Sequence, residues 1–110
     1  MKKKSIKIPI YGGTLTMIHC DNWDNVNKKY HTNILECYDG VVFKPADDFR
    51  EYVVAFNRLP KGHVIAHESV HLVSRIFEDI CVKLDSNNDE PQAYLTGWFF
   101  EQIEKFFKIT

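Results

Sequence analysis

The chain has 110 residues, which suffices for one domain with one hydrophobic core and leaves no room for a second domain. Hydrophobic residues make up 45% and charged residues 26%, a composition that predicts a folded globular chain and excludes an intrinsically disordered one. The 14 basic and 15 acidic residues give a net charge of −1 at pH 7. Such a balance argues against a general electrostatic attraction to nucleic acid or to an anionic membrane.

The start of the chain predicts a β-hairpin. Residues 5–10 alternate apolar residues with lysines, and residues 14–20 are rich in β-branched side chains. The pair Gly12-Gly13 between them supplies turn conformations. The following polar segment, residues 21–33, contains four asparagines and is predicted to be a loop.

A second hairpin is predicted around the dipeptide Asp39-Gly40. This dipeptide separates two short β-prone segments, residues 34–38 and 41–43, and Asp-Gly is a strong turn signal. Residues 51–57 are β-branched and aromatic and precede another turn, so they predict one more strand. Residues 1–58 are therefore expected to be mainly strands and loops.

Apolar residues in the second half recur at steps of three and four, which is the spacing of a helix with one buried face. The first such stripe predicts a helix over residues 63–84 and consists of Val64, Ile65, Val70, Val73, Ile76, Phe77 and Ile80. The second predicts a helix over residues 89–107 and consists of Ala93, Leu95, Trp98, Phe99, Ile103, Phe106 and Phe107. We therefore expect a single α+β domain over residues 1–110, with a small antiparallel β-sheet packed on two helices.

The cysteines and the apolar segments indicate in which cellular compartment the protein is expected. The three cysteines form no CxxC pair and leave one over, which argues against a secreted disulfide framework. The apolar residues near the start are interrupted by Lys7 and Pro9, so they do not form a signal peptide, and no apolar run is long enough to span a bilayer. The sequence predicts a soluble cytoplasmic protein that needs neither membrane nor nucleic acid.

The first predicted helix carries the sequence His67-Glu68-Ser69-Val70-His71, which fits the pattern HExxH. Residues four apart share a helix face, so the imidazoles of His67 and His71 can reach one Zn²⁺ ion. The intervening carboxylate, Glu68, is then the candidate general base for a water molecule that attacks a carbonyl group. His63 extends the row, but it lies roughly 12 Å along the helix from His71 and cannot share an ion with it.

A zinc site requires a third protein ligand, because two histidines alone bind weakly. Glu90 is the best candidate, since the 18 residues between His71 and Glu90 allow the helix to finish and a second helix to begin beside it. The adjacent Asp89 is the fallback. Tyr94, one helical turn after Glu90, is a candidate donor to the oxyanion of a tetrahedral intermediate.

The arrangement HExxH, 18 residues and a glutamate resembles the gluzincin branch of the zincin metallopeptidases. The resemblance covers residues 62–100 and implies that His67, His71 and Glu90 ligate zinc while Glu68 acts as general base. It also implies a zinc-dependent peptidase with peptide or protein substrates. In these families a sheet edge next to the active-site helix binds extended substrate, and residues 51–57 are similarly placed.

Two alternatives remain open at the level of sequence. The chain could keep a zincin-like core without catalysis and bind a protein partner, or a partner could complete the cleft, because 110 residues provide little wall for a deep one. Alternatively, Cys20 or Cys37 could take the place of water as the fourth ligand, which would make the zinc purely structural.

Overall fold

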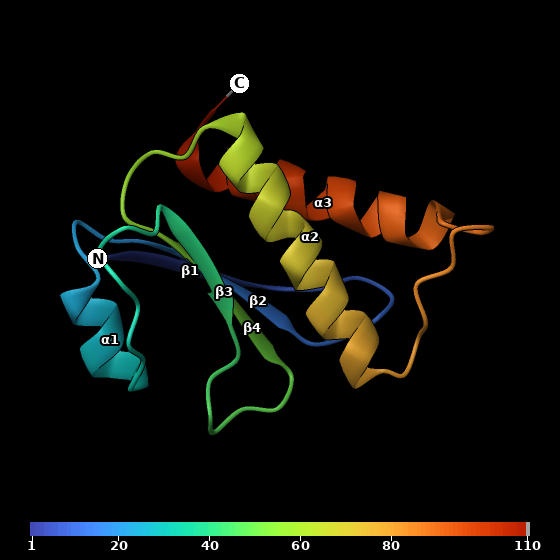
Figure 1. Cartoon of the computed structure of the whole chain (residues 1–110), viewed down its shortest axis with the longest axis horizontal. Coiled ribbons are helices and arrows are strands. Elements are labelled where there is room, and N and C mark those ends of the chain that lie inside the picture. Colours follow the sequence, from blue (N-terminus) through green and yellow to red (C-terminus); the bar gives the residue numbers. More distant parts are fainter. Residues whose placement is uncertain (110) are drawn as a thin grey trace.

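Four strands and three helices make up the chain in the computed structural model, which describes residues 1–109 (Figure 1). In chain order they are β1 (Lys2–Lys7), β2 (Thr14–His19), α1 (Asp24–Tyr30), β3 (Gly40–Phe43), β4 (Glu51–Phe56), α2 (Gly62–Asp79) and α3 (Glu90–Phe107). The predicted α+β class is confirmed. None of the helices in the described residues combines the length and the apolar character needed to cross a bilayer.

The strands form one sheet in the order β1-β2-β4-β3. The predicted first hairpin is present as the antiparallel pair β1 and β2, and Gly12 and Gly13 adopt positive φ angles of 77° and 87° in its connection. However, the sheet is mixed, because β4 runs parallel to β2 and antiparallel to β3. The parallel pair arises because the chain passes through α1 and β3 before β4 is laid beside β2.

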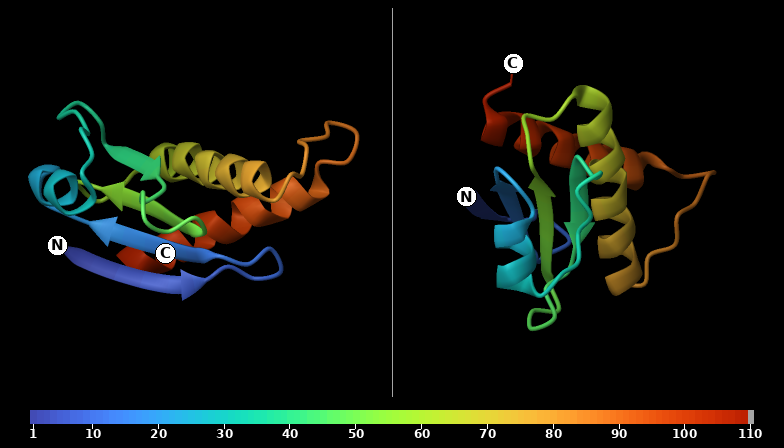
Figure 2. Two further views of the ribbon diagram at one scale, coloured as in Figure 1. Left: turned by 90° about the horizontal axis from the view of Figure 1, so that it is seen from below. Right: turned by 60° about the vertical axis from the view of Figure 1, so that its left-hand side comes forward.

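Both faces of β4 are covered, which explains its almost continuous run of buried residues. Tyr52, Val54 and Phe56 on one face join the core with α2 and α3. Val53 and Ala55 on the other face join a second core that includes α1. The helices therefore lie on both sides of the sheet (Figure 2).

Two local predictions in the first half were wrong. The predicted loop 21–33 contains α1, a short helix with a single buried aliphatic residue, Val26, so its sequence has no apolar stripe to reveal it. The dipeptide Asp39-Gly40 is not a hairpin turn, because residues 34–38 form no strand and Gly40 is instead the first residue of β3. In the second half, α2 ends at Asp79 rather than at residue 84.

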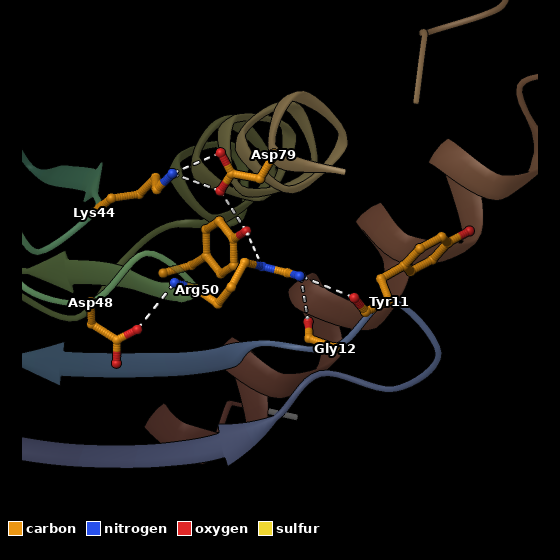
Figure 3. A network of polar contacts seen from close by, with 7 residues as sticks. Tyr11, Gly12, Lys44, Asp48, Arg50 and Asp79 are labelled. Carbon is orange, nitrogen blue, oxygen red and sulfur yellow. Dashed lines mark hydrogen bonds and ion pairs between the residues drawn. The ribbon is translucent and has the colours of Figure 1, made fainter. Parts of the chain in front are cut away.

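A polar network fixes the end of α2 to the sheet (Figure 3). The Asp79 carboxylate accepts hydrogen bonds from Lys44 Nζ at 2.7 Å and from the Tyr52 hydroxyl at 2.6 Å. Burial by itself would raise the pKa of the Asp79 carboxyl, but these hydrogen bonds and the charges of Lys44 and Arg50 bring it below its ordinary value. Burial and the bond to Asp79 raise the pKa of Tyr52 to about 12. The network thus favours the charged form of Asp79.

Arg50 extends this network to the first hairpin. Its Nε donates to the Tyr52 hydroxyl at 2.9 Å, and its Nη2 donates to the carbonyl oxygens of Tyr11 at 2.9 Å and Gly12 at 3.1 Å. Its guanidinium therefore joins the connection between β1 and β2 to Tyr52 of β4, and Tyr52 in turn is bound to Asp79 of α2 (Figure 3).

We expect Asp79→Asn to lower the free energy of unfolding at pH 7 by about 1–3 kcal/mol, because it removes charge-assisted hydrogen bonds from a largely buried group. The folded-state pKa of Asp79 is lowered, so its contribution is present above the unfolded pKa and is lost as the pH falls through the folded pKa. Urea unfolding at several pH values should show the difference from wild type shrinking towards acid. Glu78→Gln, at an exposed neighbouring position, is the control and should unfold like wild type.

Candidate functional site

The residues of the HExxH pattern lie in the first half of α2, where this helix contacts β3 and β4. A pocket of about 390 Å³ opens between α2 and residues 37–42. Six residues of α2 line it, namely His63, Val64, His67, Glu68, His71 and Arg75. Their spacing follows the helix period, because residues 63, 67, 71 and 75 are each about one turn apart.

His67 and His71 are brought together as the spacing predicts. Their Nε2 atoms are 3.1 Å apart, and their ring centroids are 4.7 Å apart. Two nitrogens bound to one tetrahedral Zn²⁺ at 2.0–2.1 Å lie roughly 3.3 Å from each other, so the pair fits two positions on one ion. Burial, assisted by the positive charges of His67 and Arg75, lowers the pKa of His71. The ring of His71 is therefore neutral, as a metal ligand must be, to a lower pH than usual.

Glu68 points from the same turn of α2 towards the sheet and is only 6% exposed. Within residues 1–109 no protein group donates a hydrogen bond to its carboxylate, whose oxygens are not among the fully buried polar atoms and face the pocket. Its ionic neighbour is His67, with Oε2 4.0 Å from Nε2. Burial raises the pKa of Glu68, and the charge of His67 offsets this only in part. A carboxylate with little access to water and no hydrogen-bond donor from the protein is costly for folding, and its place in a pocket with a raised pKa makes it a candidate functional group.

Gly40 allows Glu68 to approach the sheet. A Cβ atom at this position would lie 3.2 Å from Cγ of Glu68 and 3.0 Å from the ring of Phe56. Any side chain here would therefore displace Glu68 or Phe56. Gly40 was predicted only as a turn residue, so its place in the site was missed.

The loop that forms the opposite wall of the pocket is held by two side chains near α1. Trp23 donates from Nε1 to the carbonyl oxygen of Tyr38 at 3.0 Å. The side chain of Asn27 accepts from the amide of Ile34 at 2.8 Å and donates to its carbonyl at 3.2 Å. The position of this wall therefore depends on α1, a helix that the sequence did not predict.

Glu90 and Tyr94 do not join this site. They line a second, more apolar pocket of about 600 Å³ with Pro9, Tyr11 and other residues of the connection between β1 and β2. The apolar stripe of α3 packs against the core, and this packing places the first turn of α3 near that connection rather than beside His67. The predicted roles of Glu90 as a zinc ligand and Tyr94 as an oxyanion donor therefore have no counterpart in this geometry.

The other histidine and cysteine candidates from the sequence lie partly in this pocket and partly elsewhere in the chain. His63 lines the pocket, and so does the exposed thiol of Cys37. Cys20 is buried in the core on the α1 side, where its Sγ lies 3.6 Å from the carbonyl oxygen of Phe56. Among residues 1–109, no group of three or more His, Cys, Asp or Glu side chains is arranged to hold a metal ion.

Comparisons with protein-family models, with curated proteins and with solved structures find no match. Together with the separation of Glu90 from the two histidines, this corrects the predicted membership of the zincin metallopeptidases. The HExxH pattern has the spacing of that clan, but the third ligand that defines the gluzincin arrangement lies in another pocket. What the site can do chemically must be argued from His67, Glu68 and His71 themselves.

We expect Glu68→Gln to raise the melting temperature at pH 7, because the neutral amide avoids the burial of an unpaired charge. The folded-state pKa of Glu68 is raised, so its favourable contribution exists below the unfolded pKa and is lost as the pH rises through the folded pKa. Thermal unfolding followed by circular dichroism should therefore show a gap that opens between pH 4 and pH 7. An equal gap at both pH values would contradict a burial penalty on the carboxylate.

Proposed function

We propose that the chain is a metal-dependent peptidase, in which Glu68 is the general base and His67 and His71 are metal ligands. One observation carries the proposal: two imidazole nitrogens 3.1 Å apart and a buried carboxylate without hydrogen bonds line the same pocket. Bases of this kind gain strength from burial, because a raised pKa brings a carboxylate closer to the pH at which it works.

Zinc is the metal that we propose, because neutral imidazoles are among its most common protein donors. The ion, when bound, supplies Lewis acidity that polarises a carbonyl group and eases the deprotonation of water. Two histidines leave the other coordination positions to water and substrate. We therefore expect weaker binding than at a site with three protein ligands.

Glu68 moves the proton. Its Oε2 accepts a proton from water as the water oxygen forms a bond to the carbonyl carbon of the scissile peptide. The same oxygen then delivers this proton to the nitrogen as the carbon–nitrogen bond breaks, so the products are a carboxylic acid and an amine. The position of Glu68 on α2 keeps it adjacent to His67 throughout.

The sheet supports a peptide as the substrate. Strand β3 is an edge strand that lines the pocket opposite α2, and an extended peptide can add to a free edge through main-chain hydrogen bonds. Residues 51–57, which the resemblance suggested for this role, are mostly β4, which is paired on both sides and cannot accept another strand.

A reducing compartment such as the cytoplasm suits this protein best. Cys20, Cys37 and Cys81 are all free, and Cys37 and Cys81 are exposed. Exposed thiols of this kind persist where glutathione and thioredoxin keep them reduced.

We expect purified protein to bind one equivalent of Zn²⁺, and His67→Ala or His71→Ala to weaken that binding by roughly tenfold or more through loss of one of two protein ligands. Calorimetric titration with Zn²⁺ measures the stoichiometry of binding and the affinity of each variant. His63→Ala is the matched control, because His63 lies on the same helix face but outside the close pair, and it should bind zinc like wild type. Undiminished Zn²⁺ binding in both the His67 and the His71 variant would rule out the proposed metal site.

Glu68→Gln should retain zinc and lose hydrolysis, with kcat reduced by roughly 10²–10⁴-fold, which is the usual contribution of a general base. The measurement is cleavage of a diverse peptide library by zinc-loaded protein, followed by mass spectrometry. A variant that cleaves as fast as wild type would exclude Glu68 as the base. If wild type cleaves no peptide but forms a stable complex with a protein in pull-down experiments, the function is binding rather than catalysis.

A further inference from the structure

The pocket extends along α2 beyond His71 to an arginine that the sequence analysis did not single out. Arg75 is half-buried and lines the same pocket as His67, Glu68 and His71. It lies four residues after His71, on the same helix face, and its positive charge helps to lower the pKa of that histidine.

Arg75 forms no direct contact with an acidic side chain within residues 1–109. No ion pair or hydrogen bond to its guanidinium occurs in this part of the chain. Of the acidic groups near it, Glu68 lies in the same pocket but about two helical turns away, and Glu78 on the neighbouring turn is exposed to solvent. The other two have their own partners. Asp79, one turn further along α2, is bound by Lys44 and Tyr52, and Asp39, on the pocket wall, lies 3.4 Å from Arg58.

We propose that Arg75 binds a carboxylate of the substrate, so that the site acts on peptides with a free carboxylate one or two residues beyond the scissile bond. A guanidinium presents two parallel N–H donors that match a carboxylate, and such charge-assisted pairs are among the strongest hydrogen bonds in proteins. This inference rests on the proposed function, because His67 and His71 define where the scissile carbonyl lies.

The spacing along the helix sets the length of the released fragment. Four residues of α-helix advance about 6 Å along its axis, and an extended peptide advances about 3.3–3.6 Å per residue. A carbonyl beside His71, at the end of the pair nearer to Arg75, and a carboxylate at Arg75 are therefore separated by one or two residues of substrate. When that carboxylate is the C-terminus, the reaction releases a single amino acid or a dipeptide.

Such a contact also suits a pocket with few walls. A cleft that recognises many residues needs surfaces on both sides of the scissile bond, whereas one ion pair gives orientation and affinity from a single residue. The pocket of about 390 Å³ between α2 and residues 37–42 is large enough for a short peptide end.

Three probe peptides test the inference. They are N-acetyl-Ala-Ala-Phe-Ala with a free C-terminus, the same peptide as its C-terminal amide, and N-acetyl-Ala-Ala-Phe-Glu amide, which has only a side-chain carboxylate. Binding to the metal-free protein is followed by NMR titration, so this readout does not require activity. Hydrolysis by zinc-loaded protein is measured separately.

The wild type should bind the free acid roughly 10–100-fold more tightly than the amide, as expected for a charge-assisted bidentate contact. Arg75→Gln should abolish this preference. Arg75→Lys should retain part of it, because the positive charge remains while the two parallel N–H donors are lost. Lys83→Gln is the matched control, since it removes one positive charge at an exposed position and should keep the preference. Circular dichroism of each variant checks that it is folded.

The outcomes separate this inference from the proposed function. Equal binding of acid and amide by the wild type, or no binding of either at millimolar concentration, overturns the role of Arg75, even if both peptides are cleaved. A preference that depends on Arg75 without any cleavage supports Arg75 as a carboxylate site and overturns the peptidase. Tight binding of the third peptide identifies an acidic side chain as the preferred source, and its weak binding identifies the C-terminus.

Discussion

The burial of β4 on both faces is the constraint on which the rest of the structure depends. A strand with the sequence EYVVAF has no solvent face, so one side must be covered by α1 and the other by α2 and α3. Covering it with α2 also places the first half of that helix along the edge strand β3, because α2 contacts both strands. The pocket follows from this packing, since the helix face that does not reach the core is directed at the open edge of the sheet.

Within that pocket, stability and chemistry oppose each other at Glu68. The carboxylate is held where burial disfavours its charge, next to a glycine that allows it to approach Phe56 and β3. A more stable chain would place an uncharged residue there. The opposite end of α2 shows how a buried acid is normally accommodated, because Asp79 accepts hydrogen bonds from two partners. The contrast between two acids on one helix is the physical argument for a functional role of the first.

The sequence predicted the features that depend on local periodicity. Both long helices and the first hairpin follow from apolar spacing and from Gly12-Gly13, and the pairing of His67 with His71 follows from the helix period. Features that depend on tertiary packing were not predicted. The position of Glu90 depends on how α3 crosses the core, and a spacing of 18 residues carries no information about that.

Three further features of the structure were not predicted, and they differ in how far the sequence indicates them. α1 buries only Val26 from its own turns, so no periodicity marked it, although the Trp23 that precedes it is deeply buried. The parallel pairing of β2 with β4 requires a crossover that no local pattern encodes. Arg75 had a signal that could have been used, because it continues the four-residue spacing of His67 and His71 along one helix face.

The two edges of the sheet bear on how the protein behaves at high concentration. Free edges invite strand-by-strand association between identical chains, and natural sheets discourage it with lysines, prolines and short strands. Strand β1 carries Lys2, Lys3, Lys4 and Lys7, whose like charges repel a second copy. Strand β3 has only four residues, and Pro45 follows it after one residue, so its free edge is long enough to pair with a short peptide but not with a long strand of a second copy. Like charges on β1 and the short length of β3 are thus the features that limit strand-by-strand association of copies.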